Sequence, residues 1–207
     1  MSSEAGHFGE PSSPELLERV AVKLMERNIE VIVVADAPHA RDAVLQRVPA
    51  GAEVHAGRSK TLQDIGVTPV LAEAGTYNYL RNVYLKMDRN TQVREIRKLI
   101  SAPDFMLGSV NAVTEDGILV VTSATSTQLG PYAAGGGKVI LVVGSQKIVP
   151  NLDAALLRIR EYVLPWEDAQ VRAVVPTGSF VGKILIIERE WIAQRITVIL
   201  VRQPVGM

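Results

Sequence analysis

The stretch that decides the fold is Val139-Ile140-Leu141-Val142-Val143, an apolar run that ends at Gly144-Ser145-Gln146-Lys147. The run is rich in β-branched residues and no polar residue alternates with them, which is typical of a strand buried on both faces of a parallel sheet. Glu30 to Ala35 has the same character. Because such strands alternate with helical segments along the chain, the sequence predicts an α/β fold with a largely parallel sheet.

Working outward, the helices are recognised by their caps and their spacing of apolar residues. Ser13-Pro14-Glu15 is a typical helix start, with a capping hydroxyl, a proline in the first turn and an acid near the positive helix end. Further helices are expected at 37–48, 59–65, 79–100 and 152–163, and further strands at 53–56, 105–113, 118–121, 183–188 and 196–202. We expect the last two strands to pair antiparallel, because they lie close in sequence.

These elements predict a single three-layer α/β domain over residues 13–207, with helices on both faces of the sheet. Residues 1–12 carry Ser, Gly, Glu and Pro and little apolar content, and we expect them to form a flexible tail.

Composition narrows the class of protein. Lys+Arg and Asp+Glu number 22 each in 207 residues, so the chain has no cationic surplus for nonspecific nucleic-acid binding. No run is long enough to span a membrane, and the N-terminus has no apolar signal segment, so we expect a cytoplasmic protein without a membrane partner. The chain has no cysteine, which excludes disulfides, thiolate zinc sites and iron–sulfur clusters held by its own thiolates. His7, His39 and His55 lack metal-ligand spacing, and we expect neither a metal nor a cofactor.

Gly57-Arg58-Ser59-Lys60-Thr61 follows a predicted strand and opens a predicted helix. Gly57 allows close approach of a ligand, Ser59 can cap the helix, and free N–H groups at a helix start suit an anion. Lys60 and Thr61 could add a charge and a hydroxyl. The alternative is a plain capped helix.

Asn111-Ala112-Val113-Thr114-Glu115-Asp116-Gly117 joins two predicted strands. In the functional interpretation Glu115 is a nucleophile or general base, and Asn111 is its hydrogen-bonding neighbour. In the structural interpretation the segment is a hairpin tip, for which Asp116-Gly117 is a favourable turn sequence.

Two further segments carry candidate ligand contacts. Thr122 to Gly130 is dense in hydroxyl groups and includes Ser126 and Gln128, although a flexible surface loop would have the same composition. Gly144 and Lys147 follow the central strand, and Lys183 begins a later one. Because ligands bind at the carboxyl ends of strands in α/β sheets, we expect these residues to meet Gly57 to Thr61 and Glu115 at that edge, with Lys147 as the main charged contact.

The run from Ser109 to Arg172 resembles the LUD domain family, the lactate-utilisation proteins. The resemblance rests on Val110 to Gly117, Val139 to Val149, Asp153 to Arg160, Leu164-Pro165-Trp166-Glu167-Asp168 and Arg195 to Val201. It implies a fold similar to ribose-5-phosphate isomerase, glucosamine-6-phosphate deaminase and the CoA transferases. It also implies a role in L-lactate oxidation within a multi-protein system. Some members carry a cysteine cluster near the C-terminus, and Pro176 to Lys183 here has none, so any iron–sulfur centre would belong to a redox partner protein.

Three functions follow as alternatives. The first is a protein that supports organic-acid utilisation and binds a small anionic metabolite. The second is an acyl- or CoA-transferring enzyme, since Thr114-Glu115-Asp116-Gly117 is similar to the Ser-Glu-Asn-Gly motif around the catalytic glutamate of CoA transferases. The third is a noncatalytic metabolite-binding or assembly subunit.

Overall fold

The structure is a computed structural model that describes residues 8–73 and 75–207. Its centre is β7 (Lys138–Gly144), which has β10 (Ile196–Val201) and β4 (Phe105–Gly108) as parallel neighbours. Val139, Leu141 and Val143 point into one core, whereas Ile140 and Val142 point into another. This alternation confirms that the apolar run is a strand buried on both faces.

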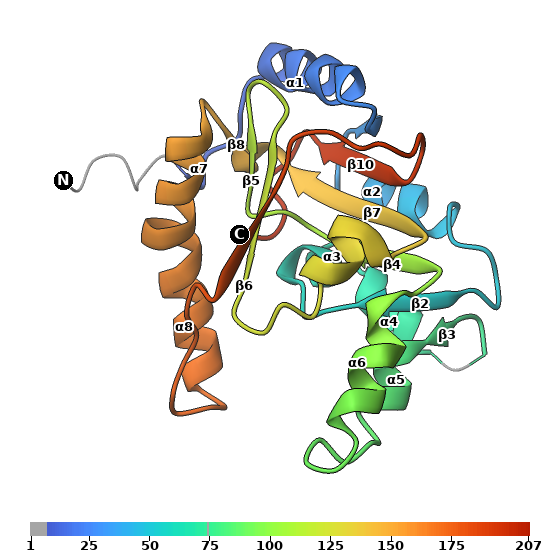
Figure 1. Cartoon of the computed structure of the whole chain (residues 1–207). Coiled ribbons are helices and arrows are strands. Elements are labelled where there is room, and N and C mark those ends of the chain that lie inside the picture. The colour runs from blue at the N-terminus through green and yellow to red at the C-terminus, as the bar shows by residue number, and fades with distance from the viewer. Residues whose placement is uncertain (1–7, 74) are drawn as a thin grey trace.

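The central sheet has six strands in the order β1-β10-β7-β4-β2-β3, and every pairing in it is parallel. Its outer strands are β1 (Glu30–Val34), β2 (Glu53–Ala56) and β3 (Asn78–Tyr79). The predicted α/β class with a largely parallel sheet is therefore confirmed (Figure 1).

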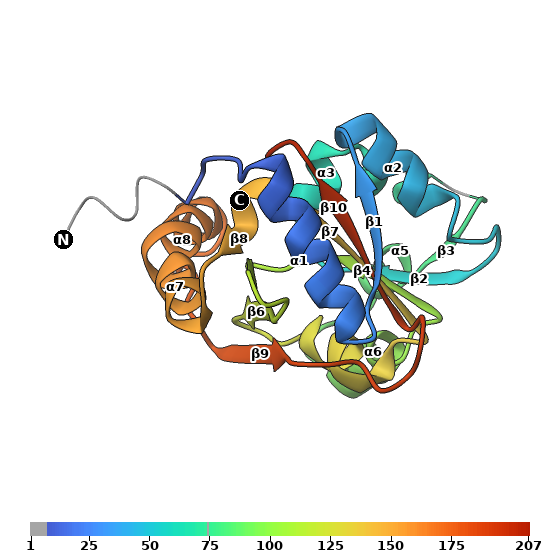
Figure 2. The same cartoon turned by 90° about the horizontal axis from the view of Figure 1, so that it is seen from above.

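Helices cover both faces of this sheet (Figure 2). On one face α1 (Pro14–Glu26) packs Leu17, Val20 and Leu24 against β7 and β10. The Ser13 hydroxyl caps the start of this helix by accepting a hydrogen bond from the Leu16 N–H at 3.2 Å. The other face is covered by α2 (Ala37–Leu45), α3 (Lys60–Asp64) and α4 (Val67–Ala72). Both helix starts at Ser13 and Ser59 have the side-chain caps that their sequences predict.

A second, smaller sheet lies beside the first, in the order β8-β5-β6-β9. It consists of β5 (Ala112–Thr114), β6 (Leu119–Ser123), β8 (Ile148–Val149) and β9 (Lys183–Ile187). Two neighbouring strands of the large sheet lead directly into it: β4 continues to β5, and β7 continues through η3 (Ser145–Lys147) to β8. We call the boundary between the two sheets the seam. The chain passes across it twice, at residues 109–111 between β4 and β5 and at η3 between β7 and β8.

This arrangement corrects two predictions. The strand expected at 105–113 is two strands in different sheets, because residues 109–111 leave β4 and their hydrogen bonds go to other partners. The strands expected to pair at the end of the chain do not meet. Instead β9 is antiparallel to β6, and β10 lies parallel between β1 and β7.

The helices also differ from expectation at two places. The predicted helix at 79–100 is two helices, α5 (Leu80–Tyr84) and α6 (Val93–Ser101), separated where the Asp88 side chain accepts bonds from Asn90 and Thr91 and forms a turn. The helix predicted to end at 163 continues from α7 (Leu152–Arg158) through η4 (Ile159–Val163) into α8 (Leu164–Arg172). The wider turn of η4 ends two residues before Pro165, a residue without an N–H to donate.

This long helical run packs against the outer face of the small sheet, through Ala155 and Ile159 (Figure 1). Residues 1–7 of the predicted tail lie outside the described residues. Phe8, by contrast, packs on this helical run: its ring centroid is 6.3 Å from that of Tyr162, and its carbonyl accepts a bond from Arg158 at 3.2 Å. Among the described residues, no helix has the length and apolar character needed to cross a membrane.

Candidate functional site

A cavity of about 540 Å³ opens at the seam between the two sheets. Its floor lies at the carboxyl ends of β2, β4 and β7, where Gly57 to Thr61, Gly108 to Asn111 and Lys147 come together. Residues 121–125 of the small sheet and its following loop, with Thr127 and Gln128, form one side, and α8 with the segment after it forms the other. The volume lies in the range of small-molecule binding sites.

Lys147 is the charged group on the floor of the cavity. Its Nζ donates to Thr61 Oγ1 and to Ser109 Oγ, each at 2.8 Å, and the residue is only 2% exposed. Within the described residues it forms no ion pair, and its two hydrogen-bond acceptors are neutral hydroxyl groups. Burial lowers the pKa of Lys147 to about 7, the positive charge of Arg158 acts in the same direction, and Asp64 opposes them.

Ser109, one of the two hydroxyl partners, is itself held in place. The Ser109 hydroxyl donates to the Val142 carbonyl at 2.6 Å, and the Ser109 N–H donates to the Tyr132 hydroxyl at 3.2 Å. Gln146 exchanges hydrogen bonds with the backbone of Val205 and so holds the C-terminal segment against the end of β7. The Lys147 amine is thus held by one hydroxyl from α3 and one from the segment between β4 and β5.

A second buried cation lies behind the floor. Arg158 of α7 is fully buried, donates to the carbonyls of Asn111 at 2.6 Å and Phe8 at 3.2 Å, and lies over the ring of Tyr162 at 5.1 Å. Burial lowers its pKa to about 10, so it stays charged at neutral pH. It too forms no ion pair among the described residues, and Lys147 and Arg158 together make this part of the seam electropositive.

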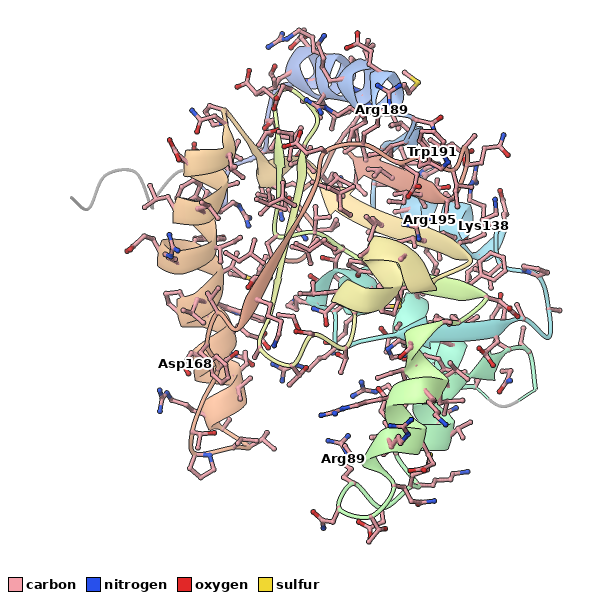
Figure 3. All side chains as sticks on the ribbon, viewed as in Figure 1. Arg89, Lys138, Asp168, Arg189, Trp191 and Arg195 are labelled. Atoms are coloured by element: carbon pink, nitrogen blue, oxygen red, sulfur yellow. The ribbon has the colours of Figure 1, made fainter. Side chains whose placement is uncertain are left out.

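The outer wall of the cavity is mostly apolar, although Glu167, Thr177 and Ser179 also contribute to it. Trp166 and Val171 of α8 line it, and so do Val175 and Phe180 of the following segment. This segment is tied back to α8 by Asp168, whose carboxylate accepts the Ser179 N–H at 2.7 Å and Arg172 Nε at 2.6 Å (Figure 3). The cavity therefore combines a polar, cationic floor with a mostly apolar wall.

Comparison with known proteins now identifies the family, because the LUD domain profile matches residues 17–201. The chain belongs to the LUD domain family. Its fold is similar to that of a DUF162 family protein from Deinococcus radiodurans, with a TM-score of 0.51 and 13% identity over 92% of this chain and 99% of that one. A likeness to eIF2B delta from Chaetomium thermophilum, with a TM-score of 0.37 and 17% identity over 69% and 56% of the two chains, is too low to support an argument. No functionally curated protein matches significantly.

Most of the residues that the sequence analysis selected line the cavity of this LUD domain: Gly57, Ser59, Lys60, Thr61, Asn111, Gln128 and Lys147. Two of them have other partners. The Ser59 hydroxyl caps α3 by accepting the Leu62 N–H at 3.3 Å, and the Lys60 ammonium pairs with Asp64. Thr61 is the member of this segment that contacts Lys147.

Glu115 does not join the other candidates, contrary to the predicted convergence. It is exposed at the turn between β5 and β6, whereas Asn111 at the other end of β5 lines the cavity. The neighbouring Asp116 forms an ion pair with Arg27 after α1, at 3.2 Å, and Gly117 has a φ of +88°. These features are those of a hairpin tip packed on α1.

Ser126, Gly144 and Lys183 also lie outside the lining of the cavity. Ser126 has a φ of +65°, and its N–H donates to the Ser123 hydroxyl at 2.9 Å. A side chain at Gly144 would clash with Gln146 and Val205, so this glycine serves close backbone packing. The Lys183 carbonyl accepts from Thr122, while its side chain is exposed.

Two features of the site were missed by the sequence analysis. Arg158 lies on the same face of the helix as the buried residues Ala155 and Ile159. The helical spacing therefore places a cation on a face that points into the core, and this pattern could have identified Arg158 from the sequence. The hydroxyl of Ser109, by contrast, had no signal, because its role depends on Lys147 and Val142 far along the chain. Among the described residues, no group of three or more His, Cys, Asp or Glu side chains is placed to hold a metal ion.

Proposed function

We propose that this LUD domain binds a small organic anion at the floor of the cavity, with the ammonium group of Lys147 as its charged anchor. The observation that carries the proposal is a buried lysine that lines a cavity and has only neutral hydroxyl partners. A buried ammonium without a counter-ion is unfavourable, because burial removes its hydration and nothing of opposite charge replaces it. A ligand carboxylate would supply that charge.

Arg158 strengthens the case for an anion rather than a cation. Its guanidinium lies behind the floor and adds a second uncompensated positive charge, which a ligand carboxylate would also interact with favourably. Thr61 and Asn111 bring a hydroxyl and an amide group to the same floor and would orient the ligand, while Ser109 positions the amine. The acidic side chain in the lining, Glu167, is paired with Arg58.

The biological role we propose is cytoplasmic organic-acid utilisation, with L-lactate or a related acid as ligand, as the family name implies. The 207 residues contain no cysteine, so the iron–sulfur chemistry of such a system would reside in a redox partner protein. A purely metabolite-binding subunit would use the same site. The transferase alternative has less support, because Glu115 lies outside the cavity.

The test is a thermal-shift screen over hydroxy acids including L-lactate, 2-oxo acids, CoA esters and sugar phosphates, followed by calorimetry on the acids that bind. Lys147→Met keeps the length and apolar stem of the side chain but removes its charge. We expect it to weaken binding of the acid at least about tenfold, or about 1.4 kcal/mol. Lys98→Met, which removes an exposed lysine on α6, is the matched control and should bind like the unchanged protein. Equal affinity of both variants, or no binding by any anion, would overturn the proposal.

A further inference from the structure

Resting on the proposed function, we infer that Lys147 also acts as a nucleophile and forms an imine with a 2-oxo acid whose apolar side chain lies along the wall made by Trp166, Val171 and Phe180. Three features of the site support this reaction: the hydrogen bonds at the nitrogen, the burial that favours a neutral amine, and the presence of both a cationic floor and a mostly apolar wall in the cavity.

The hydrogen bonds of Lys147 Nζ leave one direction around the nitrogen free for a ligand in the cavity. Lys147 Nζ has two acceptors at 2.8 Å, and both are oxygens of the cavity floor, Thr61 Oγ1 and Ser109 Oγ. The Ser109 hydroxyl donates its own proton to Val142, so it can only accept from the amine. A neutral amine has two N–H groups and one lone pair. With both N–H groups donated to the hydroxyls, the lone pair is the group left to face a ligand.

Burial supplies the neutral amine at physiological pH. Lys147, whose pKa is lowered to about 7, is half neutral at pH 7, whereas an ordinary lysine of pKa 10.5 is neutral in only about one molecule in 3,000. Arg158 on α7, Asp64 on α3 and Tyr132, whose hydroxyl contacts Ser109, are near this amine. Arg58, Lys60 and Glu167 also line the cavity, where Arg58 pairs with Glu167 and Lys60 pairs with Asp64. Burial raises the pKa of Tyr132, so the phenol stays neutral and does not hold a proton on the amine.

The reaction needs no oxidant or reductant. The lone pair on Lys147 Nζ attacks the carbonyl carbon, a C–N bond forms, and the carbonyl oxygen takes up a proton to give a carbinolamine. The nitrogen has given up one proton in this step and then gives up its second, the carbinolamine hydroxyl takes up a second proton, the C–O bond breaks, and water leaves as the C=N bond forms. The sum is one amine plus one carbonyl giving one imine plus one water. When protonated, the imine keeps the positive charge of Lys147 beside the ligand's own carboxylate.

The shape of the cavity selects the class of carbonyl compound. Its volume of about 540 Å³ exceeds what a three-carbon acid needs, and its outer wall is mostly apolar while its floor is polar and cationic. A 2-oxo acid with a branched aliphatic side chain meets both surfaces: the carboxylate and the carbonyl at the floor, and the side chain against Trp166 and Phe180.

The experiment is reductive trapping with 4-methyl-2-oxopentanoate and cyanoborohydride, followed by peptide mapping of the full chain by mass spectrometry. We expect a secondary-amine adduct at Lys147 in at least about tenfold excess over Lys60, which lines the same cavity but is exposed and ion-paired, and over Lys183. The trapping rate should rise with pH around 7. Thr61→Val and Ser109→Ala should each lower it, because each removes one acceptor that orients the amine.

A parallel measurement separates this inference from the proposed function. Binding of 4-methyl-2-oxopentanoate and of its 2-hydroxy analogue, which has no carbonyl group, is followed by calorimetry. If both acids bind but no adduct forms at Lys147, or if Lys60 and Lys183 are labelled equally, imine formation at Lys147 is wrong and the proposal of an anion-binding site is unaffected. Failure of both acids to bind and to label overturns both. Because the adduct is mapped in the protein without substitutions, this result does not require any variant to fold.

Discussion

At the scale of single residues, the fold buries a histidine ring that forms no hydrogen bond among the described residues. His55 on β2 is 1% exposed, and neither ring nitrogen has a hydrogen-bond partner among the described residues. Its imidazole lies edge-on to the ring of Tyr84, with centroids 5.9 Å apart. Burial lowers the pKa of His55 to about 4, and the nearby Arg81 charge adds to that effect, so the ring is neutral in the folded protein.

This burial predicts an acid-sensitive fold. The unfolded chain takes up a proton on His55 near pH 6.5 and the folded chain only near pH 4, so stability is lost as pH falls through this window. The full loss attributable to this residue is about 3 kcal/mol. We expect His55→Leu to remove most of that dependence. Urea unfolding at pH 7 and at pH 4.5 measures it, and an equal drop in stability for both proteins would contradict the assignment to His55.

At the scale of elements, a buried ion pair organises the turn that precedes β7. Arg195 donates to the carbonyls of Pro131, Tyr132, Ala133 and Gly136, and so satisfies the end of η2 (Pro131–Gly135). Its Nε donates to Glu190 at 2.8 Å, and both side chains are buried. Figure 3 shows Arg195 near Lys138, which in turn donates to the Gln194 carbonyl at 2.9 Å. The turn before the central strand thus depends on residues some 60 positions later.

Removing one partner of this pair is expected to cost more than removing both. Arg195→Met leaves the buried Glu190 carboxylate without its ion-pair partner and removes the side-chain donor from the carbonyls of Tyr132, Ala133 and Gly136, whereas the Pro131 carbonyl keeps the Gly136 N–H. We expect about 3–5 kcal/mol loss of unfolding free energy. Combining it with Glu190→Gln removes the unpaired charge and should recover part of that loss. Chemical denaturation of the two single variants and the double variant forms the cycle. Strictly additive losses would show that the two residues are not coupled.

At the scale of the whole molecule, local patterns predicted the alternation of strands and helices, because β-branched runs and capped helix starts are short-range signals. The division into two sheets was not predictable in the same way. The sequence Ser109-Val110-Asn111 has no feature that predicts a change of sheet. The strands β9 and β10 lie close in sequence, yet each pairs with strands that are far away along the chain. The position of Lys147 followed from its place after β7. Its burial depends on Thr61 and Ser109, which are 86 and 38 residues distant.

The central claim is that the seam between the sheets holds a buried, unpaired lysine that an anion completes. The most direct test is NMR titration of protein with isotope-labelled lysine, with the Lys147 signal assigned from the Lys147→Met spectrum. We predict that Lys147 titrates at a pKa of about 7 in the free protein and at a higher pKa when a carboxylate from the screen saturates the cavity. A free-protein pKa near the ordinary 10.5, or a pKa that the bound anion leaves unchanged, would contradict the account.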